Sequence, residues 1–247
     1  PVLLAYKNNN EISKFLNKVK NENPTYNVIA YDNSNHKIWI VEDNRRIKEI
    51  LDEINSMDSL FIADGHHRSA AALRVKKELS KKNPNHIGDE NYNYFLAVAF
   101  PHSEMNILDY NRIIKGLNGH TTDTLLSNIE KKFSIKKHEI EFKPKNINTF
   151  GMYLDNYWYE LKTNQENINS IDPVKSLDVS ILHDLIIEPL LGITDERTDP
   201  KIDFVGGARG LKELEKRVDK DGFDIAFALF PTPIESLINV ADANKVM

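Results

Sequence analysis

Residues 60–74, LFIADGHHRSAAALR, constrain the fold more than any other part of the sequence. The segment opens as a short apolar run that predicts a buried strand, and it breaks at Asp64-Gly65. It then becomes rich in alanine and leucine, which favour a helix. Around this segment, predicted strands and helices alternate along the chain, with antiparallel hairpins inserted. The order predicts an α/β (α+β) protein with a mixed β-sheet and flanking helices.

The turn between this strand and helix has the chemistry of an anion site. The first N–H groups of a helix lack intrahelical partners, and the helix dipole places positive potential there. Gly65 allows a ligand to approach the backbone closely, and Arg68 with His66 or His67 would add charge-assisted donors. Asp64 is the one acidic group, so it could hold a metal, a hydroxyl or a histidine instead.

A structural explanation of the same residues stays open. In that interpretation Asp64 caps the helix and the two histidines lie on its solvated face. Adjacent helical residues point about 100° apart, so His66 and His67 are poorly placed to chelate one ion together. We therefore expect an anion site here rather than a zinc site.

Composition narrows the class of protein. The chain has 247 residues and a formal net charge of -5, which is enough sequence for a sizeable core and gives no basic surface for nucleic acid. It contains no cysteine, which excludes disulfides and thiolate metal sites and is compatible with a reducing cytoplasm. No apolar run is long enough to cross a membrane, and no signal peptide opens the chain. We therefore predict a cytoplasmic protein with a small-molecule substrate and without a membrane partner; a homo-oligomer is compatible with the sequence.

The remaining elements follow from apolar spacing. Helices are expected at residues 11–20, 45–54, 121–133, 176–193, 211–218 and 234–240. Strands are expected at residues 2–6, 27–32, 37–42, 94–100, 135–142, 149–161, 202–205 and 224–230.

Polar residues follow the apolar run at 94–100, which predicts a strand covered on both faces. Asp109, Asn111 and Arg112 lie beyond its end, where ligands gather in α/β sheets. The alternative is a surface strand whose polar residues face water. On the predicted helix 176–193, Asp184 and Glu188 share a face and could bind a metal, although a solvated face is the commoner explanation.

A second glycine turn follows Arg197. Residues 202–205 predict a short strand, and Gly206-Gly207 and Arg209 lead into the next helix. The order strand, glycine, arginine, helix repeats that of segment 60–74, so this turn could also face an anion. Such turns are also common connections between strands and helices in α/β proteins, and the pattern is not a Walker loop.

Four blocks in order resemble a large uncharacterised prokaryotic family, a numbered domain of unknown function. They are ADGHHR at 63–68, DYNR at 109–112 with LNG at 117–119, RTD at 197–199 with DFVGG at 203–207, and AFALFPT at 226–232. Members of that family carry a further segment before Pro1 and another after Val246-Met247, so we expect sequence beyond both ends.

The block at 64–68 also resembles the phosphate-binding motif of the ParB/sulfiredoxin superfamily, which includes an ADP-dependent free-serine kinase of archaea. The resemblance implies a ParB/sulfiredoxin-like portion at residues 1–119 and a C-terminal α/β portion at 120–247, which could pack as one domain. It implies that Gly65, His66, His67 and Arg68 contact phosphate. Asp64 would orient the acceptor hydroxyl or a Mg²⁺ ion. The glutamate that acts as general base in the kinase has no identified counterpart in this sequence.

Three functions are compatible with the sequence. The first is a kinase or phosphotransferase that uses ADP or ATP with Mg²⁺ and acts on an alcohol such as free serine. Its catalytic residues would be Asp64, His67 and Arg68, with Asp64 also holding the metal. The residues that would bind the nucleotide are Gly65, His66, Arg112, Arg197, Gly206, Gly207 and Arg209. The second is a non-catalytic regulatory protein that binds a nucleotide or phosphorylated metabolite in the same pocket. The third, DNA binding by analogy with ParB, is disfavoured by the negative charge.

Overall fold

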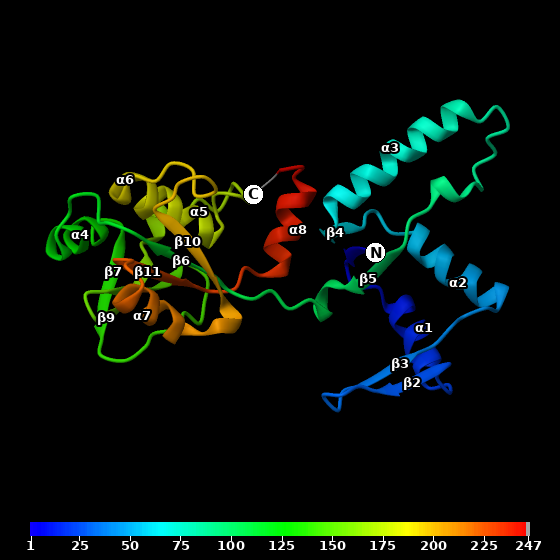
Figure 1. The fold of residues 1–247 in the computed structure, drawn as a ribbon, viewed down its shortest axis with the longest axis horizontal. Helices are drawn as coiled ribbons and strands as arrows, with labels where there is room; N and C mark the ends of the chain where they lie inside the picture. Colours follow the sequence, from blue (N-terminus) through cyan, green and yellow to red (C-terminus); the bar gives the residue numbers. More distant parts are fainter. Residues whose placement is uncertain (246–247) are drawn as a thin grey trace. The chain divides into compact units, whose positions relative to one another are not determined.

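The computed structural model describes residues 1–245, and Val246 and Met247 lie outside the described part. The chain folds into two compact units, Pro1–Met105 and Asn106–Met247. Each unit has its own sheet (Figure 1). The sequence placed the division after residue 119, whereas the strand at Tyr110–Ile114 pairs within the second unit and belongs to it.

The N-terminal unit is built on a small mixed sheet. Its strands are β1 (Val2–Tyr6), β4 (Phe61–Asp64) and β5 (Ala97–Pro101), in the order β4-β1-β5. β1 runs antiparallel to β4 and parallel to β5. The hairpin of β2 (Tyr26–Ile29) and β3 (Asn35–Ile38) forms a separate sheet, as the sequence predicted. The helices are α1 (Asn10–Lys20), α2 (Asn44–Asn55) and α3 (His66–Lys82).

Burial in this unit is concentrated in β1 and α1. Val2, Leu4 and Tyr6 of the strand and Ile12 and Phe15 of the helix are buried. The predictions of a buried strand at 60–63 and of a strand covered on both faces at 94–100 were wrong. β4 and β5 are the two edge strands, and Ile62 and Phe100 are about 40% exposed.

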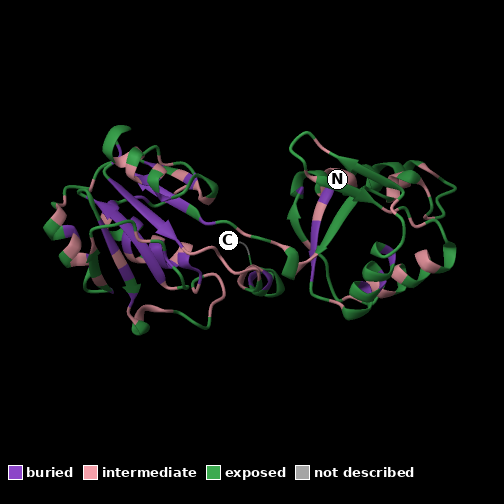
Figure 2. Ribbon diagram, turned by 90° about the horizontal axis from the view of Figure 1, so that it is seen from below, coloured by how far each residue is buried: buried purple, intermediate pink, exposed green. Residues whose placement is uncertain are grey.

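The C-terminal unit contains a six-stranded antiparallel sheet in the order β10-β6-β11-β8-β9-β7. Most of the buried residues lie in and around this sheet (Figure 2). The strands are β6 (Tyr110–Ile114), β7 (Phe133–His138), β8 (Thr149–Leu154), β9 (Tyr157–Thr163), β10 (Ile202–Gly206) and β11 (Ile225–Leu229). The helices are α4 (Thr122–Ile129), α5 (Asp178–Leu182), α6 (Glu188–Leu191), α7 (Leu211–Lys220) and α8 (Ile234–Asp242).

The two faces of this sheet carry different cores. Along β11, Phe227 and its neighbours two residues away join a cluster with residues of α4, α5 and α6. Ala226 and Ala228 point the other way and pack with Leu211 and Leu214 of α7. Side chains of a strand alternate between faces, so a strand buried on both faces is apolar throughout. This explains why residues 224–230 lack a polar alternation and confirms the predicted buried strand.

The helix predicted at 176–193 is interrupted. α5 ends at Leu182, a π-helical turn occupies His183–Ile187, and α6 begins at Glu188. Pro189 has no N–H to donate to the carbonyl four residues earlier, so regular α-helical bonding fails here. A proline inside an apolar helical pattern predicts a kink, and the structure has a π-helical turn there.

Among the described residues, no helix is long and apolar enough to cross a membrane.

Candidate functional site

The first candidate site is the turn between β4 and α3. Gly65 is the N-cap of α3 and has a left-handed conformation, with φ 96°. Within residues 1–245, no side chain caps the start of this helix, so Asp64 is not the capping residue that the structural interpretation required. Glycine adopts this conformation without strain, whereas other residues rarely do. The first amide groups of a 17-residue helix are thus left without a side-chain partner.

Arg68 lies directly over the Gly65 backbone. A Cβ atom built on Gly65 would lie 3.3 Å from the guanidinium carbon. The guanidinium donates to Asp64 Oδ2 at 2.6 Å and also to the Pro1 carbonyl oxygen. The side chains of Arg68 and Asp64 are 52% and 70% exposed, and such exposed ion pairs contribute only about 0–1 kcal/mol. An anion could therefore replace the carboxylate as partner of the guanidinium at little cost.

The two histidines of the motif occupy the first turn of α3. His66 and His67 are both exposed, as the structural interpretation of the motif expected. Neither belongs to a cluster of three metal-ligating side chains among the described residues. The structure thus places Asp64, Gly65 and Arg68 in contact and leaves the histidines open to solvent.

The second candidate site is a cavity of about 620 Å³ in the C-terminal unit. It opens where β6 begins and where β10 and β11 end. Its apolar wall includes Tyr110 and Phe204, whose rings stack with centroids 5.0 Å apart. Further lining side chains come from α5, the π-helical turn, residues 196–197 and α8, and from the segments 107–108, 174–175 and 229–232. A cavity of this size with an apolar wall and a few polar groups is typical of a small-molecule site.

A chain of polar residues lines this cavity; Arg112 is buried, and Glu196 and His183 are half-buried. Arg112 Nε lies 3.2 Å from one oxygen of Glu196, and the other oxygen lies 3.1 Å from His183 Nδ1. A carboxylate only accepts hydrogen bonds, so His183 donates from Nδ1, and its Nε2 lies 3.8 Å from Glu188 Oε2. Burial lowers the pKa of Arg112 and the ion pair with Glu196 opposes this, so the guanidinium stays charged. Arg112, which the sequence placed beyond a strand end, is thus held at the cavity wall by its ion pair with Glu196.

Arg197 lines the same cavity but is held differently. Its guanidinium pairs with Asp195 at 2.9 Å, and the side chain is 87% exposed. The structure therefore brings two of the predicted arginines, Arg112 and Arg197, to one cavity. Arg112 is buried there, whereas Arg197 is exposed.

Asp109 and Asn111 are fully engaged inside the protein. Asn111 donates to Asp109 Oδ2 at 2.7 Å and accepts from the N–H of Leu229 at 2.9 Å. Both side chains are buried, so the surface-strand interpretation of β6 was wrong. Asn111 ties β6 to β11 rather than contacting a ligand.

The second glycine turn encloses the same carboxylate. The Gly207 N–H donates to the Asp109 carbonyl oxygen at 2.7 Å, and a Cβ atom on Gly207 would lie 2.2 Å from Asp109 Oδ1. Gly207 is therefore required for close packing against Asp109. Gly206 has open space beside it, and Arg209 ends a short 3-10 helix before α7. An anion-binding role for Gly206, Gly207 and Arg209 stays a prediction.

Sequence reasoning missed Glu196 and the role of His183. Glu196 lies 84 residues from Arg112 and 13 from His183, so no local pattern connects the three. The only signal was Pro189 within an apolar helical pattern, which marks the irregular turn that carries His183.

The fold and these two sites define a two-unit α/β protein with a glycine turn, in which Arg68 covers the buried Gly65, and a cavity in the C-terminal unit. The chain belongs to the family described as protein of unknown function (DUF1015), whose model matches residues 1–180. This confirms the resemblance to a domain of unknown function. No curated protein matches the chain.

Two solved structures are distantly similar. One is a conserved hypothetical protein from Pyrococcus furiosus, with 16% identity and a TM-score of 0.38, covering 78% of this chain and 69% of the other. The second is a free serine kinase mutant in complex with AMP, with 12% identity and a TM-score of 0.37, covering 83% of this chain and 78% of the other.

Proposed function

We propose that this protein binds the phosphate groups of a nucleotide at the β4–α3 turn and transfers a phosphoryl group to an alcohol. The observation that carries the proposal is the uncapped start of α3, with Gly65 in the left-handed conformation and the Arg68 guanidinium beside it. Phosphoryl transfer asks mainly for positioned positive charge and oriented reactants. Amide groups at a helix start and an adjacent guanidinium supply both.

The residues of the turn divide into roles by their chemistry. The amide groups after Gly65, with His66 and Arg68, would hold the phosphate oxygens of ADP or ATP. Asp64 would leave its ion pair with Arg68 to hold Mg²⁺ or the acceptor hydroxyl. The hydroxyl oxygen attacks the terminal phosphorus, the bond to the bridging oxygen breaks, and the shortened nucleotide leaves. His67 would take the hydroxyl proton in the absence of an assigned glutamate base.

This proposal also includes three more specific predictions made from the sequence. They are a ParB/sulfiredoxin-like N-terminal portion, free serine as one acceptor, and a nucleotide role for Arg112 and Arg197. None of these is needed for phosphate binding at the turn. Each can be tested after binding has been measured.

One observation favours binding without turnover. Asp64 is the only carboxylate in segment 60–74, and it is engaged by Arg68 at 2.6 Å. A regulatory protein that senses a nucleotide or phosphorylated metabolite needs the anion site but no free base. This second function shares the binding step and lacks the chemical step.

Thermal unfolding with and without ligand tests the binding step. Mg²⁺ with ADP or ATP at 100 times Kd should stabilise the N-terminal unit by about 2.7 kcal/mol. Arg68→Ala should abolish this gain, whereas Arg74→Ala, an exposed arginine further along α3, should retain it. Absence of any shift at millimolar nucleotide would overturn the proposal.

A product assay then separates the two functions. The protein is incubated with ATP or ADP, Mg²⁺ and a panel of alcohols that includes free serine, and phosphorylated products are detected by ³¹P NMR. Phosphorylated alcohol that disappears in Asp64→Asn supports the transferase. Binding without any product supports the regulatory protein.

A further inference from the structure

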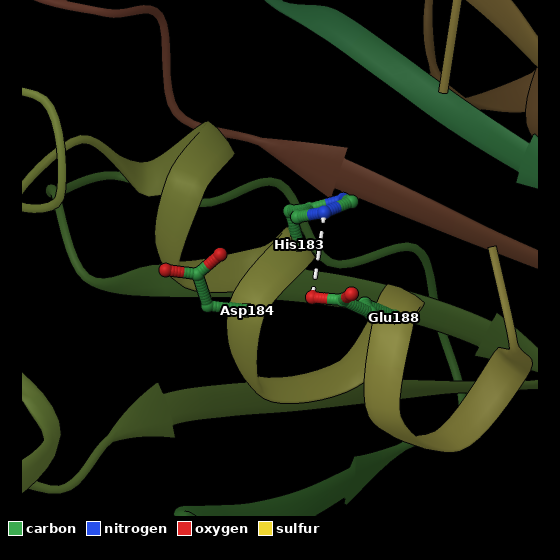
Figure 3. A group of neighbouring side chains, drawn as sticks. All are labelled: His183, Asp184 and Glu188. Atoms are coloured by element: carbon green, nitrogen blue, oxygen red, sulfur yellow. Dashed lines mark ion pairs between the residues drawn. The ribbon is translucent and has the colours of Figure 1, made fainter. Parts of the chain in front are cut away.

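A group of potential metal ligands lies on the π-helical turn of the C-terminal unit. It consists of His183, Asp184 and Glu188, and one ligand atom from each lies within 4.8 Å of the others. The π-helical turn creates this grouping. Residues five apart point about 140° away from each other on an α-helix, but in a π-helix five residues make about one turn. His183 and Glu188 therefore lie on the same side (Figure 3).

His183 is oriented as a metal-binding histidine would be. Its Nδ1 donates to Glu196 at 3.1 Å, so Nε2 is the ring nitrogen that remains for a metal ion. That Nε2 atom faces Glu188 Oε2 at 3.8 Å. Histidine ligands of metals almost always donate their other ring nitrogen to a carboxylate or carbonyl in this way. Glu196 is itself held by Arg112 at 3.2 Å, so the orienting carboxylate is fixed.

The charges of the group also favour a cation. Within residues 1–245, neither Asp184 nor Glu188 forms an ion pair with lysine or arginine, so two carboxylates lie beside the imidazole without a basic partner of that kind. Both carboxylates are exposed. Ligand atoms around an ion that binds at about 2.0–2.2 Å lie about 3–4 Å apart. Small rotations of these two exposed side chains would therefore bring the three ligand atoms to the distances that a bound ion requires.

We propose that His183, Asp184 and Glu188 bind one divalent transition-metal ion of the Zn²⁺ type, with Glu196 as the positioning residue behind His183. One imidazole nitrogen and two carboxylate oxygens suit such ions. Three protein ligands leave at least one coordination position open.

The open position would face the cavity of about 620 Å³, because His183 and Asp184 line it. A small molecule with a carboxylate or phosphate oxygen and an apolar body fits both the ion and the wall of Tyr110 and Phe204. This site lies in the C-terminal unit and is independent of the phosphate site proposed at Asp64.

Titration with the metal alone tests the proposal. The full chain, stripped with a chelator, is titrated with Zn²⁺ by calorimetry and with Co²⁺ by visible absorption. We expect a site of one-to-one stoichiometry whose Co²⁺ bands show nitrogen and oxygen ligands. His183→Gln should abolish it, and Glu188→Gln and Asp184→Asn should each weaken Kd at least tenfold. Because both carboxylates are exposed, the last two variants should fold normally.

Two controls and one variant of the positioning residue make the test specific. His138 and Glu160 form another histidine–glutamate pair, at 3.1 Å, outside any three-ligand group among the described residues. His138→Gln should leave Kd unchanged. Asp64→Asn should also leave it unchanged, which separates this site from the proposed phosphate site. Glu196→Gln should weaken Kd about 10–100-fold through the loss of orientation of His183.

Two outcomes would overturn the proposal. One is the absence of binding at 1 mM metal, on the order of the weakest affinities of protein metal sites. The other is binding that His183→Gln, Asp184→Asn and Glu188→Gln leave unaltered.

Discussion

Replacing Asp178 by asparagine should raise the free energy of unfolding of the C-terminal unit at neutral pH. Asp178 is buried at the first position of α5, directly after the N-cap residue Leu177. One carboxylate oxygen accepts from the Asn148 N–H at 2.7 Å. The other, Oδ2, has no hydrogen-bond partner among the described residues. A buried ion with an unsatisfied oxygen is costly.

The size of the effect follows from the pKa of this group. Burial raises the pKa of Asp178 from its ordinary value of 3.8 to about 6, against the opposing hydrogen bond from Asn148. A tenfold change in an ionisation constant corresponds to about 1.4 kcal/mol, so the folded protein carries a penalty of about 3 kcal/mol for the ionised group.

The sign of the pH dependence is fixed by the direction of the shift. Between pH 3.8 and 6 the folded state binds the proton more tightly than the unfolded state, so the contribution of Asp178 to stability falls as pH rises. Above pH 6 both states are ionised and the penalty is complete. Asp178→Asn carries no charge and keeps an oxygen for the Asn148 N–H, so its advantage should grow from near zero at pH 4 to about 3 kcal/mol at pH 7.

The assay is urea unfolding followed by the fluorescence of Trp158, which is buried in the C-terminal unit. The chain has two tryptophans, so a Trp39→Phe background isolates this signal. Asp155→Asn, which removes an exposed carboxylate in the β8–β9 turn, is the matched control and should show no such pH-dependent gain. Equal or lower stability of Asp178→Asn at pH 7, or a gain that does not change between pH 4 and 7, would refute this reasoning.

Two further substitutions test the packing around the cavity, with unfolding in urea as the measurement. Gly207→Ala should destabilise the C-terminal unit by about 1–3 kcal/mol because its Cβ would collide with the buried Asp109 carboxylate, whereas Gly206→Ala should be nearly neutral. Equal effects of the two would contradict the close approach. Glu196→Ala should cost about 3 kcal/mol, because it leaves the Arg112 guanidinium buried without its carboxylate. A neutral result would show that solvent compensates that charge.

The sequence predicted those parts of the fold that depend on local pattern. The break at Asp64-Gly65 correctly gave β4, a glycine turn and α3, because glycine alone adopts the required left-handed conformation easily. The apolar residues 225–230 correctly predicted a strand, and β11 is buried along its whole length. The mixed α/β class was also predictable, although the six-stranded sheet is entirely antiparallel.

The sequence predictions that failed concern features that depend on partners distant in sequence. Apolar composition suggested that β4 and β5 are buried, but composition does not reveal that both are edge strands. The same limit applies to the boundary between the units, since β6 is assigned by its pairing with β10 and β11. Glu196 was not predicted because its role arises from contact with Arg112 and His183 across the fold. The only sign of the π-helical turn in the sequence was Pro189 within an apolar helical pattern.

The most direct test of phosphate binding at the β4–α3 turn is a titration of the ¹⁵N-labelled full chain with ADP and Mg²⁺, followed by amide NMR. The account predicts that the largest shifts fall on the amides of Gly65, His66, His67 and Arg68 and that Arg68→Ala removes them. Shifts confined to residues of the C-terminal cavity, or none at millimolar nucleotide, would contradict it.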